Sequence, residues 1–132
     1  MAQLSKWALE NLAAPEITLC SSSCRTRETL LPFAEAWPGS GQSTEFLDEI
    51  YEAGTGALNF IAENAFRSCA SVFMIGHNPG FEYLAQAVLR SSDAAGINKM
   101  ATGTMAVIDF PQGYEKGCGE GVLHHWLKRK DL

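Results

Sequence analysis

The sequence predicts an α/β domain with a mostly parallel sheet and helices on both of its faces. Short apolar stretches typical of buried strands alternate with longer stretches whose apolar residues recur at helical spacing. Polar and glycine-containing turns follow two of these strands, as expected where a strand leads into a helix. Ligands bind beyond the carboxyl ends of the strands in such sheets, so these two turns are where we expect a site.

The first half of the chain contains two predicted helices with a strand between them. The opening helix has one apolar face, and Pro15 ends it. That face consists of Leu4, Trp7, Ala8 and Leu12. A buried strand is predicted over 17–20, a helix over 23–37 and a short strand over 46–47.

The second half continues the alternation. A helix with an apolar stripe follows Thr55, its expected N-cap. Residues 71–75 form a fully buried strand in this interpretation, and Asn78 is the expected N-cap of the helix after it. Two further strands, over 104–110 and 122–127, are expected to form an antiparallel pair at an edge of the sheet.

Composition excludes several classes of function. A chain of 132 residues, 46% apolar and 19% charged, fits a single globular domain over residues 1–132. The formal net charge of −5 argues against nucleic-acid binding. Neither a membrane span nor a secretory signal is recognisable, so a cytoplasmic location is expected. The four cysteines lack metal-ligand spacing, and we expect reduced thiols, no metal and no cofactor.

The two strand-to-helix turns carry the residues suited to binding an anion. In the turn over 76–80, His77 supplies a donor and the following helix offers backbone N–H groups, with Asn78 between them. In the turn after the first strand, Ser21 and Arg25 can hydrogen-bond a phosphate. Taken singly, His77 also fits a structural role and Arg25 a surface salt bridge.

Together, four segments resemble the SixA-type phosphohistidine phosphatases of the histidine phosphatase superfamily, relatives of the phosphoglycerate mutases. Residues 71–80, SVFMIGHNPG, are similar to the family's VGHNPG motif. Residues 18–29, TLCSSSCRTRET, resemble its SSPxxRAxQT stretch, and residues 100–106, MATGTMA, its MPTGALA segment. Residues 47–53, LDEIYEA, resemble the segment between them. The resemblance implies a phosphoglycerate mutase-like fold.

The resemblance also implies an activity, the hydrolysis of phosphohistidine on a phosphoprotein or of a small phosphoester through a phosphohistidine intermediate. By position, His77 and Arg25 are candidate catalytic residues that stabilise charge on the phosphoryl oxygens. Ser21 and Asn78 are candidates for shaping the phosphate pocket. Glu49 lies near the acid of the mutase relatives, although an exposed carboxylate at a helix start is the alternative.

One difference from the family concerns its nucleophile, a histidine in an R-H-G or R-H-A motif at the end of the first strand. Among the histidines here, His77, His124 and His125, none follows an arginine. We therefore expect an N-terminally incomplete domain that lacks the usual first strand and is inactive alone, with exposed sheet edges that allow self-association. The alternative is a shortened pseudo-phosphatase that binds phosphate or a phosphoprotein without turnover.

No other side chain is expected to replace this nucleophile. His124 and His125 are neighbours on a predicted strand, so their side chains point to opposite faces. Cysteine-dependent phosphatases also use a strand, a loop and an arginine, but they place five residues between cysteine and arginine. Cys20 and Arg25 have four between them.

Overall fold

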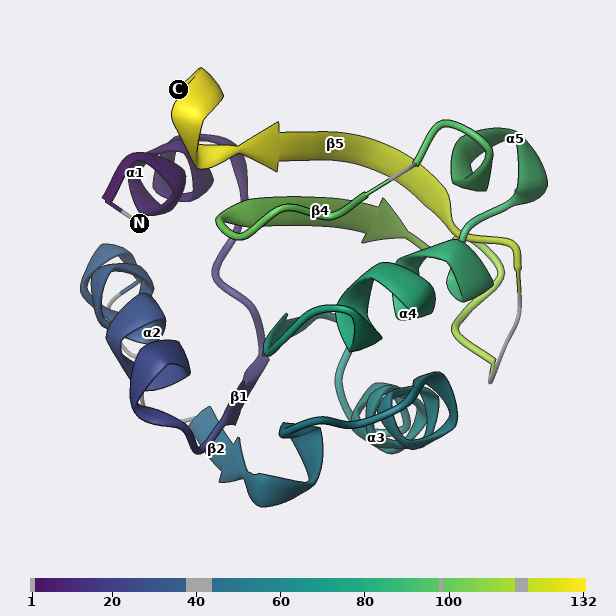
Figure 1. Ribbon diagram of the computed structural model, residues 1–132, viewed down its shortest axis with the longest axis horizontal. Coiled ribbons are helices and arrows are strands. Elements are labelled where there is room, and N and C mark those ends of the chain that lie inside the picture. Colours follow the sequence, from purple (N-terminus) through teal and green to yellow (C-terminus); the bar gives the residue numbers. More distant parts are fainter. Residues whose placement is uncertain (1, 38–43, 98, 116–118) are drawn as a thin grey trace.

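The computed structural model describes residues 2–37, 44–97, 99–115 and 119–132. Figure 1 shows the arrangement of the helices and strands. In chain order they are α1 (Ala2–Asn11), β1 (Ile17–Ser21), α2 (Cys24–Ala36), β2 (Thr44–Leu47), the 3₁₀ turn η2 (Asp48–Ile50), α3 (Thr55–Phe66), β3 (Val72–Ile75), α4 (Gly80–Val88), α5 (Ser91–Ala94), β4 (Thr104–Asp109), β5 (Val122–Lys128) and the 3₁₀ turn η3 (Arg129–Asp131). Within these residues no helix is long and apolar enough to cross a membrane.

The described strands form two separate sheets. In the first, β1 lies between β2 and β3, and both pairings are parallel. The second sheet consists of β4 and β5, which pair antiparallel with an irregularity at Val107 and Ile108. The predicted α/β class and parallel sheet are confirmed, and so is the antiparallel pair. Its expected place at an edge of the parallel sheet is wrong, because β4 pairs only with β5 among the described residues.

Helices cover both faces of the parallel sheet. Successive strand side chains point to opposite faces, and the structure sorts them accordingly. Leu19 of β1 packs in a cluster with Leu58 of α3, whereas its neighbour Cys20 packs with Leu30 of α2. Figure 1 shows α1 and α2 on one side of β1, with α3 and α4 on the other.

The predicted apolar face of α1 is confirmed, and it packs against α2 and against strands of both sheets. Leu4 and Ala8 of α1 are buried against Phe33 and Trp37 of α2 and its C-terminal end. Partly buried side chains from three strands complete the cluster; they are Phe73, Met105 and Leu127. The two sheets therefore share this core although no hydrogen bond joins β3 to β4 in the described part of the chain.

Three local expectations need correction. Gly54, not Thr55, is the N-cap of α3, and Pro79, not Asn78, is the N-cap of α4. The Asn78 side chain instead donates its amide hydrogen to the Met100 carbonyl. Strand β3 is not fully buried, and only Ile75 of its four residues is. The reason is that β3 lies at the edge of its sheet among the residues that the structure describes.

Two glycines allow the turn after β3 to pack closely against the connection between β2 and α3. A Cβ atom on Gly76 would lie 2.4 Å from the Phe81 ring and 2.8 Å from Ile50. A Cβ atom on Gly80 would lie 2.5 Å from the backbone oxygen of Ala53. The space beside both Cα atoms is therefore occupied by other atoms of the protein.

We predict that Gly80→Ala destabilises the fold by about 1–3 kcal/mol, because a backbone oxygen cannot move aside as the end of a flexible side chain does. The matched control is Gly56→Ala in α3, where nothing lies within 4 Å of the added Cβ atom. That change should stabilise the chain by about 0.5–1 kcal/mol through lower backbone entropy. Urea unfolding measures both, and equal effects at the two positions would contradict the packing argument.

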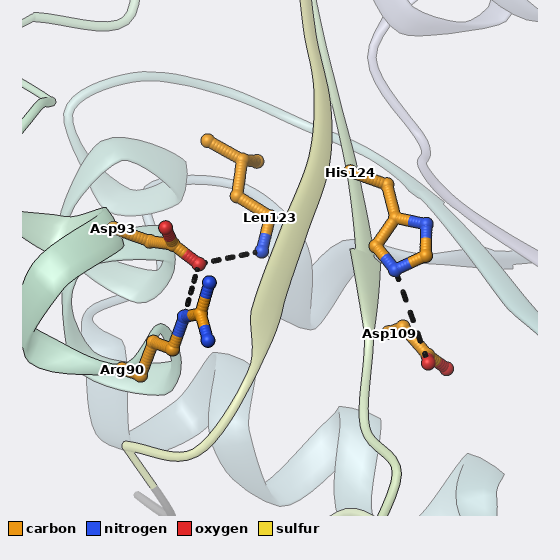
Figure 2. Close-up of polar contacts among 5 residues, drawn as sticks. All are labelled: Arg90, Asp93, Asp109, Leu123 and His124. Atoms are coloured by element: carbon orange, nitrogen blue, oxygen red, sulfur yellow. Dashed lines mark hydrogen bonds and ion pairs between the residues drawn. The ribbon is translucent and has the colours of Figure 1, made fainter.

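A polar network attaches the start of β5 to α5 (Figure 2). The Asp93 carboxylate accepts hydrogen bonds from Arg90 Nε at 2.8 Å and from the Leu123 backbone N–H at 2.9 Å. These two hydrogen bonds, that from Leu123 first, hold the pKa of Asp93 below its ordinary value. The network thus favours the ionised carboxylate in the folded state.

Asp93 should make stability depend on pH in the acid range. Its folded pKa is lowered, so its contribution is complete above the ordinary aspartate pKa of about 4 and is lost as pH falls through the lower folded value. Asp93→Asn should therefore lower the urea midpoint clearly at about pH 7 and much less at about pH 3. Asp109→Asn is the control, because Asp109 is exposed and lies 4.0 Å from an exposed His124 (Figure 2). An Asp93→Asn effect of equal size at both pH values would contradict the assignment.

Candidate functional site

The parallel pairing of β1 with β3 places two candidate residues in contact. Cys20 pairs with Ile75 in this register, so both strands end at the same edge of the sheet. Ser21, the last residue of β1, is fully buried and its hydroxyl lies 2.8 Å from His77 Nε2. Of the residues expected from the sequence, the structure thus brings Ser21 and His77 together directly.

The turn after β1 is held by its own side chains. The buried Thr26 hydroxyl donates a hydrogen bond to the Ser21 carbonyl at 2.6 Å. The Ser23 side chain caps α2 by accepting from the Thr26 N–H at 3.4 Å. These contacts fix the direction in which α2 begins, and with it the position of Arg25 in its first turn.

Arg25, His77 and Asn78 are among the residues that line a cleft of about 490 Å³. Arg25 and Asn78 are exposed and His77 is half-buried, so a solute can reach all three. An imidazole, a guanidinium and the turn at the start of a helix offer hydrogen-bond donors and positive charge to the same cleft. The arrangement suits an oxyanion such as phosphate.

Tyr51 contacts His77, although within the family-like segment over 47–53 the sequence singled out Glu49 and not Tyr51. Its ring meets the His77 imidazole edge-on, with ring centroids 5.2 Å apart and an interplanar angle of 86°. The connection that carries Tyr51 is anchored by the buried Ile50 and by a hydrogen bond from the Ser22 hydroxyl to the Asp48 carboxylate. The β2–α3 connection therefore forms a wall beside His77.

Arg27 also lies near the end of β1. Its Nε donates to the Ser22 carbonyl at 2.9 Å, and its guanidinium carbon lies 4.4 Å from the centre of the Phe46 ring. Among the described residues it makes no ion pair. A second guanidinium thus stands beside the turn that holds Ser21 and Arg25.

The remaining candidates lie apart from the cleft. Glu49 is exposed in η2 and is not among the cleft-lining residues, so its expected catalytic role stays a prediction. His124 lies 4.0 Å from the Asp109 carboxylate, and the His125 ring packs edge-on against Trp7 at 4.8 Å. Neither histidine lines the cleft. In the described part of the chain, no group of side chains suitable for a metal ion is found.

Cys20 lies next to Ser21 but is unsuited to nucleophilic attack. Its side chain is fully buried. Burial raises the pKa of the Cys20 thiol, an effect that a hydrogen bond with Thr26 and the charge of Arg27 only partly offset. The thiol is therefore neutral at neutral pH, whereas a thiolate is the nucleophilic form.

Known structures share this fold. A protein assigned as the phosphohistidine phosphatase SixA of Nakamurella multipartitia matches with a TM-score of 0.80 and 20% identity, over 96% of this chain and 77% of that one. One assigned as SixA of Agrobacterium tumefaciens matches with a TM-score of 0.76 and 25% identity, over 96% and 76%. The protein histidine phosphatase SixA complexed with tungstate matches with a TM-score of 0.79 and 19% identity, over 99% and 80%.

These matches confirm the expected fold, and the chain has the SixA-type histidine phosphatase fold. No family model and no curated protein matches the sequence. The similarity that the comparisons find is therefore in the arrangement of the helices and strands.

Cys20 should resist alkylation in the folded chain. We expect iodoacetamide at neutral pH to modify the exposed Cys24 quickly and Cys20 only after unfolding in urea, as measured by mass spectrometry of peptides. Cys24 serves as the internal control, because it follows closely in the sequence at the start of α2 but is exposed. Rapid modification of Cys20 in the folded chain would contradict its assignment as a buried neutral thiol.

Proposed function

We propose that this chain carries the phosphate-binding part of a SixA-type phosphatase, which acts on phosphohistidine or on a small phosphoester. The hydrogen bond between Ser21 and His77, beside Arg25 at the carboxyl ends of two parallel strands, is the observation that carries the proposal. Ligands bind at this edge in open α/β sheets. One structural neighbour is described as complexed with tungstate, an oxyanion like phosphate, which supports the same ligand class.

Each proposed residue has a distinct part in binding. The Arg25 guanidinium supplies charge and paired N–H donors for the phosphoryl oxygens. The His77 imidazole adds a donor whose ring orientation the buried Ser21 hydroxyl fixes, so little freedom is lost on binding. Asn78 contributes through its backbone, since its side chain is bonded to Met100. Tyr51 restricts the space beside His77.

The 132 residues by themselves are proposed to bind phosphate without hydrolysing it. The resemblance implies a phosphohistidine intermediate, which needs a histidine nucleophile in addition to His77. His124 and His125 are engaged elsewhere, and the Cys20 thiol is buried. Charge stabilisation without a nucleophile leaves at most slow turnover.

Binding of inorganic phosphate and of orthovanadate tests the proposal by calorimetry and by thermal shift. We expect both anions to bind and to raise the midpoint of unfolding. Arg25→Ala and His77→Ala should each weaken binding by about tenfold or more, since a charge-assisted hydrogen bond is lost. Arg67→Ala is the control, because Arg67 is exposed and paired with Glu63 at 3.5 Å on α3.

Two outcomes would contradict the proposal. The first is the absence of any anion binding by the wild-type chain. The second is hydrolysis of a phosphohistidine substrate that survives His77→Ala and is lost in Cys20→Ser, because that pattern would assign the chemistry to the thiol. The alternative is a pseudo-phosphatase that binds phosphate in the same way. Codons for R-H-G or R-H-A, in frame and upstream of Met1 in the genomic DNA, would contradict this alternative.

A further inference from the structure

Tyr51 is an exposed aromatic residue whose backbone is held in place. It is 55% exposed, whereas its neighbour Ile50 is 1% exposed and packs in the core cluster with Leu19 and Leu58. The Tyr51 N–H donates a hydrogen bond to the Asp48 carbonyl at 3.0 Å. The phenol ring is therefore presented to solvent from a fixed backbone position.

The exposed ring lies beside the candidate phosphate-binding histidine. The ring centroids of Tyr51 and His77 are 5.2 Å apart, and the two ring planes are nearly perpendicular at 86°. His77 lines the cleft together with Arg25, whereas Tyr51 is not among the cleft-lining residues. Tyr51 thus lies on the outer side of His77, where the rest of a substrate would extend from a phosphoryl group bound in the cleft.

The uncovered part of the Tyr51 ring is suited to a flat unsaturated group. In the described part of the chain, His77 is the one aromatic ring that Tyr51 contacts. Aromatic rings attract one another through their charge distribution in addition to the area that they bury, and a short alkyl group lacks this contribution. Tyrosine also loses little conformational entropy on binding, because its side chain has few rotatable bonds.

We propose that Tyr51 determines specificity at this site, by packing against a planar ring bonded directly to the phosphorus atom of the substrate, as the imidazole is in phosphohistidine. A phosphoryl group on an alkyl chain would lack this contact. The role rests on the proposed function, since it requires the phosphoryl group to bind at His77 and Arg25. It also extends that function, because phosphate binding alone does not distinguish phosphohistidine from a small phosphoester.

Phenylphosphonate and methylphosphonate test this role, because they differ only in the group on phosphorus. Neither C–P bond is hydrolysed, so calorimetry at a pH where both are dianions measures binding alone. We expect the wild-type chain to bind phenylphosphonate about fivefold more tightly or better. Equal affinity for the two anions would overturn the specificity role and leave the proposed function intact. Binding of neither anion would overturn the proposed function, and the specificity role with it.

The ratio of the two affinities is then measured in variants. Tyr51→Ala should reduce it to about twofold or less, whereas Tyr51→Phe should retain it because the ring remains. Phe60→Ala is the matched control and should leave the ratio unchanged. Phe60 is 56% exposed on α3 and contacts no other aromatic ring among the described residues. A ratio that Tyr51→Ala leaves unchanged would overturn the proposal, even if both anions bind more weakly, because Tyr51 would then act only through His77.

Proton NMR of the wild-type chain gives a second measurement, which does not depend on the folding of a variant. We expect nuclear Overhauser cross-peaks between the phenyl protons of bound phenylphosphonate and the ring protons of Tyr51. Cross-peaks from the phenyl protons to other side chains, with none to Tyr51, would overturn the proposed contact.

Discussion

The parallel pairing of β1 with β3 is the constraint on which the rest of the molecule depends. It buries β1 at the centre of its sheet and brings the ends of both strands to one edge. There the buried Ser21 hydroxyl reaches His77, although the two residues lie 56 positions apart in sequence. The helices that follow each strand then begin at the same place, which gives the edge its hydrogen-bond donors and its positive charge.

The residues that support the site are buried, whereas its binding groups are reachable by a solute. Thr26 and Ile50 are nearly inaccessible and hold the two connections that surround His77. Arg25, by contrast, is exposed at the start of α2. Close approaches at Gly76 and Gly80 pack the turn after β3 against the wall that carries Tyr51. Preorganisation of this kind lowers the entropic cost of binding an anion.

Local sequence patterns predicted the elements and the two turns, but not how distant segments meet. The face of Leu4 and Ala8 followed from helical spacing, and His77 from its place between a strand and a helix. The contact of Tyr51 with His77 depends on the path of the β2–α3 connection, which no spacing encodes. Likewise, β3 has the composition of a central strand, yet it lies at an edge, because burial depends on neighbours outside its own sequence.

A structure determined in the presence of tungstate tests the central claim most directly, since it locates the anion without reference to any enzymatic assay. The account predicts tungstate at the joined ends of β1 and β3, within hydrogen-bond distance of His77 and Arg25, with the bond between Ser21 and His77 retained. Tungstate bound elsewhere on the chain, with this edge of the sheet left without the anion, would contradict it.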